Sequence, residues 1–249
     1  QVESGACIHI CYEGAKLKPM TRYTWMVRVW DNRGEISDWT EGYFETGLMD
    51  LGWEAQWITV KAEEKPPQCP VFRKTFALEK IPQSARIYAT ALGNYEVTLN
   101  GVRVGDQWLA PGFTSYNKHL LYQTYDVTEL LANENELRVT VANGWHMSRL
   151  AGRVNVFGGK HAILLQLCAV AEDGKNVLAA TDDSWEYGDS PTLASEIYDG
   201  ESYDAALEPD CYRNWRPVEF WNYPKSHIVA QAHEPVRITH QVKPVEMIR

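Results

Sequence analysis

The 249-residue sequence predicts an all-β fold made of antiparallel sheets. Short segments rich in β-branched and aromatic residues recur from Val71 onward, and Gly, Asn, Asp and Pro separate them, as is typical of strands joined by turns. No segment keeps the period of a long amphipathic helix. We therefore expect a jelly-roll-like antiparallel β-sandwich over residues 71–225.

Residues 1–47 predict part of a second sandwich. Large apolar residues recur at every second position from Tyr23 to Val29, a turn follows at Asp31–Gly34, and residues 43–46 can return antiparallel. Tyr23 also has the position of a tyrosine corner, in which a tyrosine hydroxyl bonds to upstream backbone. These features resemble the C-terminal part of a fibronectin type III domain. Because an intact domain of this kind has about 100 residues, we expect its first strands to be missing.

Two segments flank the predicted sandwich. Residues 48–70 combine acidic and Lys residues with three prolines, which predicts an irregular linker. Trp53 and Trp57 lie in this linker, and we expect them to fill an interface between domains. Residues 226–249 look like the start of a following β domain.

One short helical turn is expected inside the sandwich. The stretch "DVTELL" begins with a residue that favours the first position of a helix. We expect Asp126 to accept a hydrogen bond from the backbone N–H of Glu129, whose carboxylate can reach back. The segment is too short for a longer helix.

The composition excludes several classes of partner and cofactor. A net charge of −9 and a pI near 5.3 oppose the basic surface that nucleic acids require. No apolar run approaches the roughly 20 residues of a membrane-spanning helix. The five Cys and seven His lack the spacing of metal ligands, so no metal and no other cofactor is expected.

A long loop after a tight hairpin is the first candidate binding site. Asn100–Gly101 predicts a type I′ turn, because both residues tolerate positive φ. The excursion that follows, residues 105–117, is longer than hairpin closure needs and carries Trp108, Phe113 and Tyr116. Their rings could cover the apolar face of a sugar, or the loop could fold onto its own sandwich.

Two further segments combine polar groups with aromatic rings. In "ANGWHMSR", the pair Asn143–Gly144 interrupts a strand and projects Trp145 and His146 from the end of the sandwich. In "YDGESYDA", carboxylates beside tyrosines could accept hydroxyl hydrogens of a sugar, whereas the spacing of a calcium loop is missing. The candidates there are Tyr198, Asp199, Glu201 and Asp204. The alternatives are simple packing for the first segment and a solvated turn for the second.

Three stretches resemble the N-terminal accessory region of bacterial α-L-rhamnosidases, and the similarity covers essentially the whole chain. They are "FETGLMDLGWEAQWI", "YEVTLNGVRVGDQWLAPGFTSYNKHLLYQTYDVTELLANENELRVTVANGW" and "IYDGESYDAALE". The order of strand, "NG", loop and "YDVT" is shared more loosely with the sugar-binding jelly rolls of β-galactosidases and β-glucuronidases.

The resemblance implies that the complete enzyme hydrolyses terminal α-L-rhamnose from glycosides, with inversion at the anomeric carbon. In that family the catalytic carboxylates lie in a downstream (α/α) barrel, and this chain has no series of long amphipathic helices. We therefore expect a non-catalytic portion that recognises rhamnosides and docks to the catalytic domain. The alternatives are an autonomous carbohydrate-binding module and a structural spacer.

The compartment stays open at this stage. The sequence starts at Gln1 without a segment like a signal peptide, and we interpret it as a piece of a longer polypeptide. Bacterial enzymes of this kind occur in the cytoplasm as well as in the periplasm or outside the cell.

Overall fold

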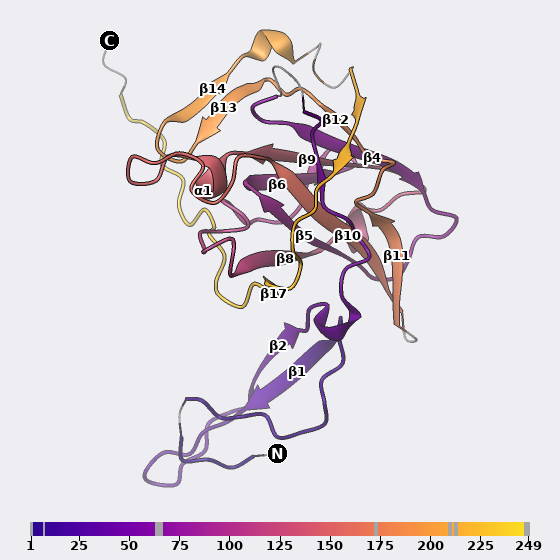
Figure 1. Cartoon of the computed structure of the whole chain (residues 1–249). Helices are drawn as coiled ribbons and strands as arrows, with labels where there is room; N and C mark the ends of the chain where they lie inside the picture. Colours follow the sequence, from indigo (N-terminus) through magenta and orange to yellow (C-terminus); the bar gives the residue numbers. More distant parts are fainter. Residues whose placement is uncertain are drawn as a thin grey trace. The chain divides into compact units, whose positions relative to one another are not determined.

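The computed structural model describes residues 2–6, 8–62, 67–171, 174–208, 211 and 214–246, and it divides into two compact units, residues 1–52 and 53–249 (Figure 1). Strands are the main regular elements of both units. Among the described residues, the helical elements are the four-residue α1 (Gly144–Met147) and three single 3-10 turns, η1 (Met49–Leu51), η2 (Thr128–Leu130) and η3 (Ala205–Leu207). The predicted all-β fold with antiparallel sheets is confirmed.

The first unit is built on a hairpin of β1 (Arg22–Val27) and β2 (Thr40–Glu45). The rings of Tyr23 and Phe44 stack with their centroids 5.4 Å apart. The hydroxyl of Tyr23 accepts a hydrogen bond of 2.7 Å from the backbone N–H of Lys18, five residues upstream. This is the contact that the tyrosine-corner spacing predicts, and it anchors the chain that enters β1.

The second unit contains two main sheets. The first has the order β16 (Glu219–Phe220), β3 (Ile58–Thr59), β10 (Ala162–Ala171), β5 (Ala85–Leu92), β8 (Leu120–Asp126) and β17 (Ile228–Ala230), with β11 (Gly174–Ala180) paired to β10. The second has the order β15 (Arg216–Pro217), β12 (Glu186–Gly188), β4 (Val71–Ala77), β9 (Glu134–Ala142), β6 (Asn94–Leu99) and β7 (Val102–Arg103). A separate hairpin joins β13 (Thr192–Glu196) to β14 (Gly200–Tyr203).

The two main sheets enclose the principal core, and strand periodicity explains which residues enter it. Along β6 and β9, buried and accessible residues alternate, so Tyr95, Val97 and Leu99 point inward. Every residue of β5 is buried instead. This strand needs apolar residues at nearly every position, because its sheet is covered on both faces.

The face of this sheet that points away from the principal core is covered by segments that lie far apart in the sequence. Trp57, Tyr116, Leu120 and Leu164 belong to one buried cluster, against which residues near Trp221 pack. Trp57 and β3 fall within the predicted linker 48–70, yet they are part of the second unit. Burial of a large aromatic ring is a strong driving force, and here it outweighs the irregular composition of the segment.

The C-terminal segment, residues 226–237, forms a strap along the edge of this sheet. Its strand β17 lies parallel to β8, with Ile228 opposite Leu120 (Figure 1). Gln231 accepts hydrogen bonds from Gln107 at 2.9 Å and from Gln123 at 2.8 Å. The strap therefore holds the long loop that follows β7.

The turn predictions have different outcomes. Asn100 and Gly101 have φ of 54° and 80°, and Leu99 pairs with Val102, so the two-residue hairpin is confirmed. The helical turn predicted at "DVTELL" is present as η2, but it starts only at Thr128, because β8 extends through Asp126. Asp126 accepts from the N–H of Thr128, at 3.1 Å.

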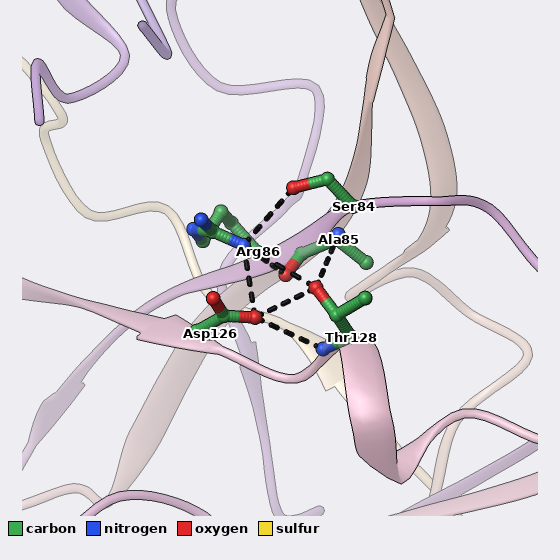
Figure 2. A network of polar contacts seen from close by, with 5 residues as sticks. All are labelled: Ser84, Ala85, Arg86, Asp126 and Thr128. Carbon is green, nitrogen blue, oxygen red and sulfur yellow. Dashed lines mark hydrogen bonds and ion pairs between the residues drawn. The ribbon is translucent and has the colours of Figure 1, made fainter. Parts of the chain in front are cut away.

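Asp126 has a second partner that links two strands. Its Oδ1 atom lies 2.9 Å from Nη1 of Arg86, whose side chain is 9% exposed. Figure 2 shows how the hydroxyl of Thr128 completes this network by bonding both to Asp126 and to the N–H of Ala85. The network fixes the start of β5 against the end of β8.

Candidate functional site

A cleft of about 450 Å³ lies over the outer face of the second sheet. Its floor includes Asn94, Glu96 and Thr140, which take the outward positions of β6 and β9. Trp108 from the long loop and Glu201 from β14 line the same cleft. Two candidate residues from distant segments thus come together over a polar strand face.

The indole of Trp108 is fixed from several sides. The Cζ atom of Arg103 lies 4.3 Å from the centroid of its ring, within the range of a cation–π contact. The backbone N–H of Trp108 donates to the carbonyl of Val236 in the strap, at 2.8 Å. The side chain remains 39% exposed. Trp108 is therefore a positioned ring at the edge of the cleft.

Carboxylates supply the acceptors of the cleft. Glu201 pairs with Ser195 across the β13–β14 hairpin and is exposed. Beneath it lies Cys69, for which burial and then the charges of Glu201 and Glu196 raise the pKa to about 11. This thiol stays neutral at pH 7, so it supplies no nucleophile to the cleft.

Four other candidate residues meet in an aromatic cluster beside α1. The ring centroids of Phe113 and Trp145 are 5.7 Å apart, and those of Tyr116 and His146 are 5.3 Å apart. Phe157, which sequence reasoning missed, joins both pairs, at 6.5 Å from Phe113 and 5.3 Å from Tyr116. Tyr116 is buried, whereas Phe113 is 60% exposed. The loop thus rests on this cluster and leaves one ring at the surface.

His146 of this cluster and the nearby His161 are buried imidazoles. Burial lowers the pKa of His146 to about 4, and burial followed by the nearby His146 lowers the pKa of His161 to about 4 as well. Asn143 Oδ1 lies 2.9 Å from Nε2 of His161, while its amide nitrogen donates to Glu196. For His146, neither ring nitrogen has a hydrogen-bond partner among the residues that the structure describes. Both rings are therefore neutral at pH 7.

Gly144 allows α1 to approach the floor of the cleft. Its φ is +52°, and a Cβ at this position would lie 2.4 Å from Oδ1 of Asn94 and 2.5 Å from its backbone nitrogen. Only glycine fits this conformation and this space. The turn that carries Trp145 and His146 is thus tied to the first residue of β6.

Two of the candidate carboxylates around the β13–β14 hairpin make structural contacts. Asp199 lies 2.5 Å from Nη2 of Arg149, and Asp204 caps η3 by accepting from the N–H of Ala206 at 3.0 Å. Tyr198 is exposed. Of the four candidates here, Glu201 is the one that lines the cleft.

The comparisons with known proteins decide the family. The model of the alpha-L-rhamnosidase N-terminal domain matches residues 80–240. The chain belongs to this family. In addition, residues 1–50 match the Rha78A-like, N-terminal immunoglobulin domain. The rhamnosidase resemblance is thereby confirmed, and the first unit is of immunoglobulin type.

Curated relatives support the assignment along most of the chain. An alpha-L-rhamnosidase of Formosa agariphila is 34% identical over 87% of this chain and 26% of its own length. One of Alteromonas sp. is 32% identical over 94% of the chain and 27% of its own length. The rhamnosidase N-terminal region described here thus spans about a quarter of the length of these relatives.

Solved structures share its fold. The native rhamnosidase of Aspergillus terreus matches with a TM-score of 0.80 and 33% identity, over 90% of this chain and 28% of that one. The rhamnosidase of Dictyoglumus thermophilum matches with a TM-score of 0.80 and 30% identity, over 95% of this chain and 29% of that one.

Within the described ranges, no three His, Cys, Asp or Glu side chains come together as a metal site. The search for long apolar helices, which covered the same residues, found none that could cross a membrane.

Proposed function

We propose that this chain is the non-catalytic N-terminal portion of an α-L-rhamnosidase that hydrolyses terminal α-L-rhamnose from glycosides, and that it serves in substrate recognition and docking to the catalytic barrel. The observation that carries the proposal is the cleft that Trp108 and Glu201 line together above the polar floor of β6 and β9. Its volume of about 450 Å³ is suited to one or two sugar rings.

The chemistry of the cleft fits a neutral sugar. An indole face covers the apolar side of a pyranose ring, and a carboxylate accepts charge-assisted hydrogen bonds from its hydroxyl groups. Trp108 supplies the first group, and Glu96 and Glu201 supply the second. A terminal rhamnose combines a methyl group with vicinal hydroxyls, so it can use both kinds of contact.

Docking is assigned to the aromatic cluster beside α1. Phe113 is 60% exposed and lies against Trp145 and Phe157. A supported aromatic ring at the surface is a typical anchor of a protein interface. The exposed Tyr198 and the ion pair of Asp199 with Arg149 add a polar rim.

The finer fold assignment is part of the same proposal. We infer a jelly roll for the second unit, because two mainly antiparallel sheets enclose one core. For the first unit we infer the fibronectin type III variant of the immunoglobulin sandwich, supported by the Tyr23 to Lys18 contact.

The first prediction concerns catalysis. With p-nitrophenyl α-L-rhamnoside, the chain is expected to release no more nitrophenol than buffer does. An inverting glycosidase needs two carboxyl groups that act as general acid and general base across the bond, whereas Glu96 is 50% exposed and is engaged by Arg103, whose Nη2 lies 3.6 Å away. Steady turnover that disappears in both Glu96→Gln and Glu201→Gln would show that the cleft is an active site.

The second prediction concerns recognition. Trp108→Ala is expected to weaken binding of methyl α-L-rhamnopyranoside about tenfold in isothermal titration, equal to about 1.4 kcal/mol, because the stacking face is lost. Phe113→Ala is the matched control, since Phe113 is a loop aromatic outside the cleft. In the complete enzyme Trp108→Ala should raise KM and leave kcat unchanged. An unchanged Kd and KM would contradict the recognition role.

An autonomous carbohydrate-binding module is the second candidate function. Trp108 supplies a ring face and Glu96 and Glu201 supply acceptors, so the described residues offer both kinds of contact that a sugar needs. Titration of the chain with methyl α-L-rhamnopyranoside separates the candidates. A Kd of about 1 mM or below supports an independent module, and binding that needs the complete enzyme supports a shared site.

A further inference from the structure

A second pocket, of about 540 Å³, lies at the β16 edge of the first sheet, away from the cleft. Aromatic side chains dominate its lining, namely Trp57, Phe220, Trp221 and Tyr223. The polar residues that line it are Gln56, Asn222 and Lys225. None of the described residues of this lining is acidic, in contrast to the cleft on the other sheet.

Trp57 is the buried member of this lining. It is 1% exposed, and its Nε1 atom is closed to water as well. The indole therefore supports the aromatic wall of the pocket and donates no hydrogen bond to a ligand.

Two lysines give the pocket a positive charge. Lys225 lines it and donates one hydrogen bond, of 2.5 Å, to the carbonyl of Ala55. An ammonium group has three N–H donors, so two remain for a ligand. The Nζ atom of Lys160 lies 4.6 Å from the ring centroid of Trp221, which adds a second cation at the wall.

The wall itself offers a surface for a ring. Trp57 and Tyr223 meet edge to face, with centroids 5.5 Å apart, and the hydroxyl of Tyr223 donates to the carbonyl of Tyr116 at 3.2 Å. These contacts hold the aromatic side chains in place. Phe220 is 57% exposed and lies at the open side, where a sugar ring can pack against it.

We propose that this pocket binds a sugar residue that carries a carboxylate, such as the uronic acid unit of an acidic glycan. The carboxylate accepts hydrogen bonds from Lys225, and the pyranose ring packs on the aromatic wall. The site is distinct from the cleft proposed for neutral rhamnosides. It would place an acidic part of the same polysaccharide on the opposite sheet.

The test compares two ligands that differ in the carboxylate alone. In isothermal titration of the 249-residue chain at low salt, methyl β-D-glucuronide is expected to bind at least tenfold more tightly than methyl β-D-glucopyranoside. Lys225→Gln should remove this preference, and Lys225→Arg should retain most of it, because the charge stays in place. Raising NaCl to about 0.5 M should weaken glucuronide binding several-fold, since salt screens the ion pair.

Several outcomes would overturn the proposal. Equal affinity for the two glycosides would show that the carboxylate is not recognised. Sodium acetate that competes as well as the glucuronide would show an anion site without a sugar site. Trp108→Ala is the control, because it should leave glucuronide binding unchanged while it lowers rhamnoside binding. A loss of glucuronide binding in Trp108→Ala would place the ligand in the cleft instead, and melting curves confirm that each variant is folded.

Discussion

Acidification from pH 7 to pH 4 is expected to lower the free energy of unfolding of the second unit by about 6 kcal/mol. His146 and His161 each have a pKa of about 4 in the folded chain, against 6.5 as the ordinary value. The unfolded chain therefore binds more protons than the folded chain between these two values. Each ring contributes stability that is fully present above pH 6.5 and lost as the pH falls toward 4, at about 3 kcal/mol per ring.

A single substitution isolates half of this effect. His146→Leu removes one titrating ring, and because the ring nitrogens of His146 have no partner among the described residues, stability at pH 7 should change by less than about 1 kcal/mol. Urea unfolding at pH 7 and pH 4.5 measures both quantities. His119→Asn, at an exposed imidazole, is the matched control and should keep the full pH dependence. A His146→Leu chain as acid-sensitive as the unmodified one would refute this origin of the effect.

Asp126→Ala is expected to destabilise the second unit by about 3 kcal/mol. The substitution leaves the guanidinium of Arg86, 9% exposed, without its ion-pair acceptor at 2.9 Å, and a largely buried charge is costly when its counterion is removed (Figure 2). It also removes the acceptor for the N–H and the hydroxyl of Thr128. Urea unfolding at pH 7 is the measurement.

Two further variants show whether the buried charge is the cause. In an Arg86→Met background, Asp126→Ala should cost much less, because no buried cation is left behind. Asp106→Ala removes the exposed ion pair with Arg237, whose side chains are 72% and 45% exposed, and should cost less than about 1 kcal/mol. Equal losses for Asp106→Ala and Asp126→Ala would contradict the explanation.

Local contacts were predictable from the sequence. The Asn100–Gly101 turn needs positive φ at two neighbouring residues, and the Tyr23 contact spans five residues. Both depend on short-range geometry, which a sequence records directly. The alternation in "NYEVTL" likewise places Asn94 and Glu96 on one face of β6, a signal that could have identified the floor of the cleft.

Contacts between distant segments were not predictable in the same way. Trp57 lies in a segment whose prolines and charges favour a linker, yet it is buried beneath Tyr223. Phe157 joins Phe113 through the folding of a separate loop. Neither pairing has a periodic signature, because the energy comes from burying rings that lie more than 40 residues apart in the chain. The start of the turn after Asp126 was misplaced for a related reason, since the pairing of Asp126 with Arg86 in β8 is also a contact between distant segments.

The hydrogen bond from the backbone N–H of Trp108 to the carbonyl of Val236 connects the cleft to the C-terminal strap. One wall of the cleft is fastened, backbone to backbone, to the segment by which the chain leaves the sandwich, and Arg237 reinforces the joint through Asp106 at 2.6 Å. The position of the indole, and with it one wall of the cleft, therefore depends on where this segment lies.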